Sequence, residues 1–246
     1  MRLYQTILVA AICLGAGNAH AGIVIDDFNN FATPITSPAK ALSWGGGWEI
    51  DADRYDPDPV TYPGQGTYLE TGLPNVLGGS RYSEVYNQVS ATNANIEVDN
   101  GGFDTSAGPS TWLIAILTYD ANGSGLNLNA THGTKITVTE TSADFYAGGK
   151  DTVYSVTLVD GSDAADTVSK TFSSLVNNPS MPADHDFLFS SYTGLDLTDI
   201  DKIIVTLETS YAQDSSFGSI HSDVPEPATL SLLALGGLAL LRRRRK

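Results

Sequence analysis

Short segments in which apolar and polar residues alternate recur through residues 22–223, and they constrain the fold more than any other feature. The clearest are residues 134–140, 152–160 and 203–208, which are rich in Thr, Val and Ile. Such alternation is typical of strands that bury one face. Residues 112–117 are apolar on both faces, which fits a central strand or a buried helix segment, and their length favours a strand.

Glycine-rich turn signals separate these segments and give the region its spacing. Further strands are expected at residues 23–28, 66–71, 82–89, 95–98 and 186–190. Residues 164–170 and 197–201 suggest short helices, and residues 120–125 suggest a hairpin turn. Many short strands at this spacing predict an all-β fold, a single antiparallel β-sandwich.

The first 21 residues have the layout of a secretory signal peptide with a short helix. Arg2 supplies a positive charge and residues 7–16 are apolar. Ala19 and Ala21 form the small-residue pattern of a cleavage site, so cleavage by signal peptidase is expected before Gly22. The apolar run is shorter than the ~20 residues that span a bilayer, which argues against the alternative of a permanent N-terminal anchor.

Cysteine and charge limit the chemistry of the exported part. The only cysteine, Cys13, lies within the signal segment, so residues 22–223 have no disulfide, zinc-thiolate site or cysteine nucleophile. They carry 7 basic and 27 acidic side chains, a net charge of −20 (7 minus 27). This charge repels phosphate, so we expect no nucleic acid partner.

The C-terminal tail combines three features in order. Pro225-Glu226-Pro227 comes first, residues 228–241 carry no charge, and a basic cluster fills residues 242–246. A helix over residues 225–241 would rise ~26 Å, close to the ~30 Å hydrocarbon core of a bilayer. The basic cluster would stay in the cytoplasm. We therefore expect a transmembrane helix in an inner-membrane precursor whose C-terminus is cytoplasmic.

This tail resembles the PEP-CTERM sorting signal of Gram-negative bacteria. The resemblance implies that an exosortase, a membrane enzyme similar to cysteine proteases, recognises Pro225, Glu226 and Pro227 and processes the chain there. Two prolines hold this stretch extended and outside the following helix. The alternative is an ordinary single-pass anchor with a proline-rich linker. We expect a signal peptide at residues 1–21, a sandwich at 22–223 and a sorting tail at 224–246.

Residues 22–223 also resemble the jelly-roll sandwiches of carbohydrate-binding modules, through the stretches at residues 25–28 and 195–208. The resemblance implies that the first and last strands lie side by side. It also implies that Asp26 or Asp27 could share a structural ion with Asp214. Ordinary acidic residues at strand ends are the alternative.

Four aromatic residues are candidates for ligand binding: Trp44, Trp48, Tyr82 and Tyr86. The two tryptophans bracket three glycines, and the two tyrosines share one strand face with Glu84. Exposed rings of this kind stack on the apolar faces of sugars. Tryptophan and tyrosine also pack in protein cores, so core packing is the alternative.

One acidic loop is a candidate metal site: Asp51, Asp53, Asp56 and Asp58. Carboxylates at this spacing suit Ca²⁺, although the EF-hand pattern fails because Asp56 stands where glycine is needed. A solvated loop is the alternative. The chain requires no cofactor, and Ca²⁺ is the ion that this loop favours.

Residues 22–223 contain no nucleophile elbow, no His-Glu-x-x-His motif and no phosphate loop. We therefore predict a non-enzymatic exported protein of the cell envelope or extracellular matrix, with extracellular polysaccharide as its candidate partner. The mature protein would lie in the outer envelope or outside the cell. The alternatives are a secreted carbohydrate-active enzyme, which needs two facing carboxylates, and a structural matrix protein without a specific ligand.

Overall fold

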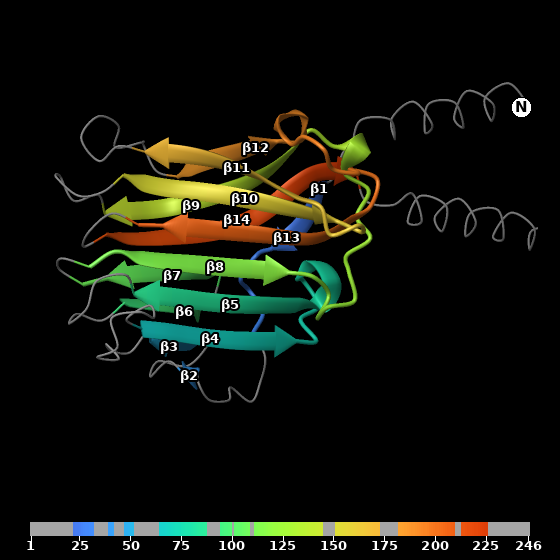
Figure 1. The fold of residues 1–246 in the computed structure, drawn as a ribbon. Coiled ribbons are helices and arrows are strands. Elements are labelled where there is room, and N and C mark those ends of the chain that lie inside the picture. The colour runs from blue at the N-terminus through green and yellow to red at the C-terminus, as the bar shows by residue number, and fades with distance from the viewer. Residues whose placement is uncertain are drawn as a thin grey trace, which may run out of the picture.

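The structure is a computed structural model of the chain. It describes residues 22–31, 39–41, 47–51, 64–87, 94–99, 101–108, 111–144, 151–172, 182–209 and 213–225. Within them, two antiparallel sheets stack into one sandwich (Figure 1). The predicted all-β sandwich is therefore confirmed, and its jelly-roll form stays a prediction.

The first sheet, sheet A, has eight strands. They are β1 (Gly22–Asp26), β2 (Lys40–Ala41), β3 (Trp48–Asp51), β6 (Ala94–Asp99), β7 (Gly102–Ala107), β9 (Lys135–Asp144), β12 (Ala183–Leu188) and β14 (Asp214–Pro225). Their order is β12-β9-β14-β7-β6-β3-β2, and β1 pairs with β14 beside this path. The first and last strands thus lie side by side, as the resemblance implied.

The second sheet, sheet B, has six strands. They are β4 (Gly64–Thr71), β5 (Ser80–Asn87), β8 (Leu113–Tyr119), β10 (Thr152–Asp160), β11 (Ala165–Phe172) and β13 (Ile200–Glu208). Their order is β11-β10-β13-β8-β5-β4. Helical structure in the described residues is limited to three 3-10 turns: η2 (Leu77–Gly79), η3 (Ala130–His132) and η4 (Phe189–Ser191).

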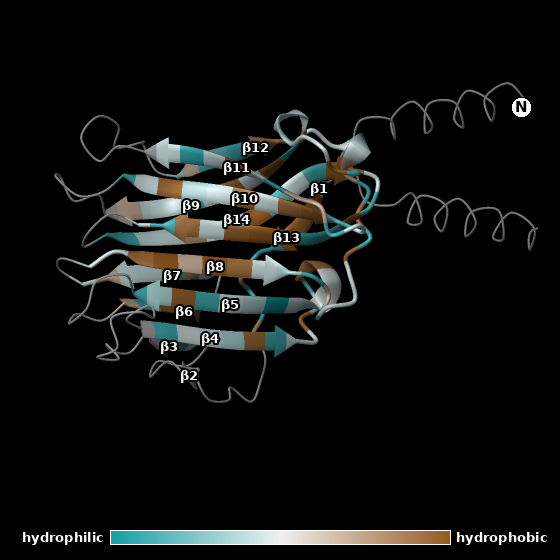
Figure 2. Ribbon diagram, viewed as in Figure 1, coloured by the Kyte–Doolittle hydropathy of each residue, from teal (hydrophilic) through white to brown (hydrophobic). Residues whose placement is uncertain are grey.

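Alternating side chains of both sheets form the core. On β8, residues 113, 115, 117 and 119 are buried and the residues between them are half-buried, so this segment is a strand and not a helix. Aromatic contacts close the gap between the sheets: Tyr154 packs edge-on against Phe217, with ring centroids 5.9 Å apart. Figure 2 shows apolar residues concentrated on β8 and β13, while β4 and β5 are more hydrophilic.

Both helix predictions are wrong. Residues 165–170 of the first predicted helix belong to β11, whose eight residues all pair with β10. The Asp160 side chain closes the turn between the two strands by accepting hydrogen bonds from the N–H groups of Ser162 and Ala164. This pairing outweighs a weak local helix propensity. Of the second predicted helix, residues 197–199 form a turn and residues 200–201 begin β13.

The turn at residues 120–125 is present but does not make a hairpin. The Gly125 N–H donates to the Asp120 carbonyl oxygen at 3.0 Å, which closes the turn. The chain then passes through η3 to β9, which lies in the other sheet. The segment is therefore part of a connection between sheets, which a local turn signal does not distinguish from a hairpin.

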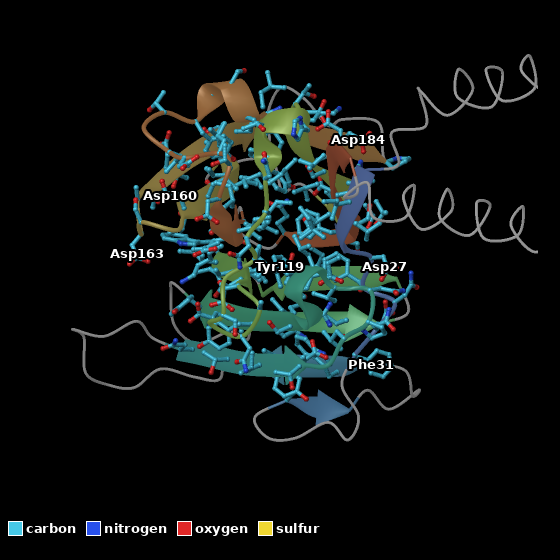
Figure 3. All side chains as sticks on the ribbon, turned by 90° about the vertical axis from the view of Figure 1, so that its right-hand side faces the viewer. Asp27, Phe31, Tyr119, Asp160, Asp163 and Asp184 are labelled. Carbon is cyan, nitrogen blue, oxygen red and sulfur yellow. The ribbon has the colours of Figure 1, made fainter. Side chains whose placement is uncertain are left out.

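A buried ionic network joins the two sheets. The Arg81 guanidinium on β5 donates to Asp26 Oδ2 at 2.8 Å and to Glu70 Oε2 at 2.6 Å. The Tyr119 hydroxyl donates to the same Asp26 oxygen at 3.0 Å. Arg81, Asp26 and Glu70 are inaccessible to solvent. The network therefore ties β1 of sheet A to β4, β5 and β8 of sheet B. Figure 3 labels one of its members, Tyr119, near the middle of the end view.

Two predicted segments fall outside the described residues, namely the signal segment at residues 1–21 and most of the sorting tail. No helix among the described residues is long and apolar enough to cross a membrane. The last strand continues to Pro225, two residues past the expected domain end at residue 223. The folded domain therefore reaches the first residue of the Pro-Glu-Pro motif.

Replacing Arg81 with methionine should destabilise residues 22–225 by about 3–5 kcal/mol, because two buried carboxylates lose their cation. Urea denaturation measures this change. Lys135→Met is the matched control, since the Lys135–Asp186 pair is solvent-accessible and should contribute less than ~1 kcal/mol. Equal losses in the two variants would contradict the role given to Arg81.

Candidate functional site

The two tryptophan candidates have different outcomes. Trp48 is 0% exposed, and its ring packs edge-on against Tyr68 with centroids 5.1 Å apart. Trp48 is therefore a core residue, and its interpretation as an exposed platform was wrong. Trp44 lies outside the described residues. The sequence allowed both interpretations because β3 is short, and its pairing with β6 decides which face of the strand is buried.

The two tyrosine candidates lie on the outer surface of the sandwich. Tyr82 and Tyr86 are half-buried on β5, as is Glu84 between them, while Ser83 and Val85 on the same strand are buried. The two tyrosines are four residues apart, which separates their Cα atoms by roughly 13 Å along an extended strand. Because the alternate residues Ser83 and Val85 are buried, the face of β5 that bears the two rings points away from the core.

Neighbouring strands extend this surface, which we call the tyrosine face. It comprises Tyr82, Glu84 and Tyr86 of β5, with their cross-strand neighbours Gln65, Thr67 and Leu69 on β4 and Ile114, Ile116 and Thr118 on β8. Leu69 is 46% exposed, which is unusual for a large apolar residue in this domain. The face thus mixes aromatic, aliphatic and polar groups across three strands.

Hydrogen bonds orient one ring of the tyrosine face. The Tyr86 hydroxyl donates to Glu84 Oε1 at 2.8 Å and accepts from Gln65 Nε2 at 3.1 Å. These partners come from two strands, so the ring is held at its polar end. A pre-ordered ring loses less conformational entropy when a ligand binds.

The opposite outer surface carries a row of acids that the sequence did not indicate as a site. Glu49, Glu97 and Asp104 are cross-strand neighbours on β3, β6 and β7. Carboxylate oxygens of Glu97, Asp99 and Asp104 lie within 4.8 Å of one another. These residues are distant in sequence from Glu49, and only the pairing of the three strands brings the row together. The one sequence signal that could have indicated this row is the pair Glu97 and Asp99, two acids on the same face of one strand.

The acidic row shifts the pKa of its members. Burial, followed by the nearby charges of Asp104, Glu49 and Asp99, raises the pKa of Glu97 to about 6. Burial also raises the pKa of Asp104, although the Ser216 hydroxyl donates to its carboxylate and acts against this. Such a group of carboxylates can hold a proton or a hard cation.

Replacing Glu97 with glutamine should stabilise the domain at pH 7.5 by about 1 kcal/mol, after allowance for solvent screening. Because folding raises this pKa, the stabilising effect of the protonated Glu97 is full below pH 4.5 and is lost as the pH rises through about 6. Glutamine imitates the protonated form at every pH. Urea denaturation at pH 4 and pH 7.5 measures this, and a gain that does not change with pH would contradict it.

Most of the calcium candidates lie outside the described residues, so calcium binding by the acidic loop stays a prediction. Asp53, Asp56 and Asp58 lie outside them, and of Asp51 only the backbone, at the end of β3, is described. The predicted ion shared by Asp26 or Asp27 with Asp214 does not fit the strand register, and Asp27 directly follows Asp26. Asp26 pairs along β14 with Ile220 and binds Arg81, whereas Asp214 lies six residues away, roughly 20 Å along the strand.

Two of the sorting candidates, Gly22 and Pro225, are described, and they lie side by side. Gly22, the expected first residue after signal cleavage, begins β1 and pairs with Pro225, the last residue of β14. Ala19, Ala21, Glu226 and Pro227 lie outside the described residues. The family profile of the PEP-CTERM protein-sorting motif matches residues 223–246.

The chain carries a PEP-CTERM sorting motif. This motif indicates an exported, membrane-anchored precursor that exosortase processes. The predicted resemblance of the tail to the PEP-CTERM sorting signal is confirmed, and the match covers only residues 223–246. No curated protein matches the chain.

Solved structures with some likeness to the chain are carbohydrate-binding modules. The family 11 module of a cellulosomal cellulase of Clostridium thermocellum is 13% identical, with a TM-score of 0.31, and the match covers 78% of this chain and 97% of that one. A family 61 module in complex with β-1,4-galactotriose is 10% identical, with a TM-score of 0.32, over 56% of this chain and 80% of that one.

Proposed function

We propose that this protein is an exported, non-catalytic glycan-binding protein of the cell envelope or extracellular matrix, with the tyrosine face as its binding surface. The observation that carries the proposal is the pair of half-buried rings on β5, one of them oriented by Glu84 and Gln65. Signal peptidase and exosortase would act on the precursor, and extracellular polysaccharide would be the partner of the mature domain.

The composition of the tyrosine face matches the chemistry of a sugar chain. Tyrosine rings and the exposed Leu69 offer apolar surface to the C–H faces of sugar rings. Glu84, Gln65 and Thr118 offer acceptors and donors to hydroxyl groups beside those rings. Two rings roughly 13 Å apart along a strand suit an extended oligosaccharide better than a single sugar.

Tyr82→Ala and Tyr86→Ala should each weaken glycan binding about ten-fold, which corresponds to the loss of one stacking contact of ~1.4 kcal/mol. Tyr86→Phe should retain part of the affinity, since it keeps the ring and loses the hydroxyl that Glu84 orients. A glycan array of residues 22–225 identifies the oligosaccharide, and isothermal titration calorimetry measures its Kd for each variant.

The matched control for these variants is Thr157→Ala. Thr157 lies on the same outer surface, but on β10, three strands away from β5 in sheet B. Its affinity should equal that of the wild type. The proposal is overturned if the array shows no binding to any glycan, or if the Tyr82→Ala/Tyr86→Ala double variant binds as tightly as Thr157→Ala.

A carbohydrate-active enzyme is the second candidate, because one observation favours it. Glu97, with a pKa of about 6, lies within 4.8 Å of Asp104, measured between carboxylate oxygens. A protonated carboxylic acid close to a second carboxylate is the pair that glycoside hydrolysis uses. Release of reducing sugar by the wild type but not by Glu97→Gln would support the enzyme and replace the non-catalytic proposal.

Calcium at the Asp51–Asp58 loop is also a proposal, supported only by the supply of four carboxylates. Calorimetric titration of residues 22–225 with CaCl₂ tests it. The absence of binding heat, or heat unchanged in Asp53→Asn, would remove the loop as a site.

For sorting, replacing Pro225, Glu226 and Pro227 together with alanine should leave the full-length precursor unprocessed in the membrane, because the segment loses its extended form and its charge. Co-expression with an exosortase and gel analysis of membrane and released fractions measures the outcome. Processing at the wild-type rate would contradict recognition of these three residues.

A further inference from the structure

The last residues of β14 are held on one side by β1. Gly22 pairs with Pro225 and Ile23 with Ser222. A Cβ atom at Gly22 would lie 2.1 Å from the Ser222 carbonyl oxygen, so any other residue would push the two backbones apart. The strand that runs into the sorting motif is therefore in close backbone contact with the first residues of the mature domain.

The loop between η3 and β9, together with Lys135 at the start of β9, holds Asp223 and Val224 on the other side. Asp223 Oδ1 accepts hydrogen bonds from the N–H groups of Thr134, at 2.6 Å, and Lys135, at 2.9 Å. Its Oδ2 accepts from the Thr134 hydroxyl. A Cβ atom at Gly133 would lie 2.6 Å from Val224 Cγ2. Burial opposes ionisation of Asp223, but these hydrogen bonds outweigh it and lower its pKa.

These two sets of contacts form what we call the β14 clamp: Gly22 and Ile23 on one side, residues 133–135 on the other. Ser222 is 0% and Val224 3% exposed within it. Only Glu226 and Pro227 separate Pro225 from the uncharged segment at residues 228–241. An extended chain covers at most ~3.6 Å per residue, so the clamp ends within ~11 Å of that segment.

An enzyme that acts on the Pro-Glu-Pro segment therefore has little free chain to work with. The residues before the motif are paired, buried and hydrogen-bonded, and the residues after it enter the apolar segment. An extended substrate segment needs free backbone groups and space on both sides to enter an enzyme cleft. Local opening of a strand end supplies both at a free-energy cost below that of global unfolding.

We propose that residues 222–225 must leave the β14 clamp before exosortase processes the chain, so that Asp223 controls the rate of sorting. This inference rests on the sorting role of the tail and is independent of glycan binding. Asp223 is a positioning residue, because it acts on the motif through its hold on the loop at residues 133–135.

Asp223→Asn tests the proposal in the full-length precursor co-expressed with an exosortase. The variant loses the charge that strengthens the hydrogen bonds from Thr134 and Lys135. Pulse-chase conversion of precursor to processed protein should become roughly ten-fold faster, which corresponds to about 1.4 kcal/mol in the opening equilibrium. Thr134→Val removes one donor without altering the tail, and should accelerate processing by a smaller factor.

Asp160→Asn is the matched control. Asp160 also fixes a turn by accepting backbone hydrogen bonds, but it lies on sheet B, on the opposite flank of the end view from Asp27 (Figure 3). Its processing rate should equal that of the wild type. Hydrogen exchange should show faster exchange in Asp223→Asn at Thr134 and Lys135, and unchanged exchange on β8. Faster processing in Asp160→Asn as well would mean that general destabilisation, and not the clamp, sets the rate.

A four-residue Gly-Ser insertion between Val224 and Pro225 separates the motif from the clamp. This variant should be processed faster than the wild type, and adding Asp223→Asn to it should have no further effect. An insertion variant that is processed at the wild-type rate or more slowly overturns the clamp proposal and leaves sorting intact. A wild-type precursor that is never processed overturns both.

Discussion

The strand β14 is the element on which the sandwich depends. It pairs with β9 on one edge and with β7 and β1 on the other, so it lies inside sheet A and not at its border. Phe217, Ile220 and Val224 of this strand are buried in the core. Without β14, β9 and β12 lose their pairing to the rest of sheet A. Because β14 ends at the sorting motif, completion of the fold and presentation of the motif involve the same residues.

The Arg81 network gives β1 its second attachment. β1 pairs with one strand only among those described, and Asp26 at its end is bound by Arg81 and Tyr119 from the other sheet. Buried charges tolerate few alternative partners, because each unpaired charge in the core costs several kcal/mol. The network therefore fixes where β1 ends, and with it the position of Gly22 beside Pro225. Gly22, which follows the expected signal-cleavage site, therefore lies beside Pro225, the first residue of the Pro-Glu-Pro motif.

Local pattern predicted the strands with regular alternation but not the elements that depend on pairing. The strands at residues 134–140, 152–160 and 203–208 are present as parts of β9, β10 and β13, since each buries one face. β11 was missed because its residues form a strand through hydrogen bonding to β10, which the local sequence pattern does not reveal. Trp48 was ambiguous because its burial depends on which face of β3 meets sheet B. The acidic row was missed because three strands distant in sequence build it.

The two outer surfaces of the sandwich differ in chemistry: sheet A carries a row of carboxylates and sheet B carries the tyrosine face. The central claim is that glycan binds to sheet B. An NMR titration of residues 22–225 with the oligosaccharide bound most tightly on the array, observed at labelled tyrosine rings and backbone amides, tests it most directly. The account predicts shifts of Tyr82, Tyr86 and the amides of β4, β5 and β8. Shifts confined to Glu49, Glu97 and Asp104 on sheet A would contradict it.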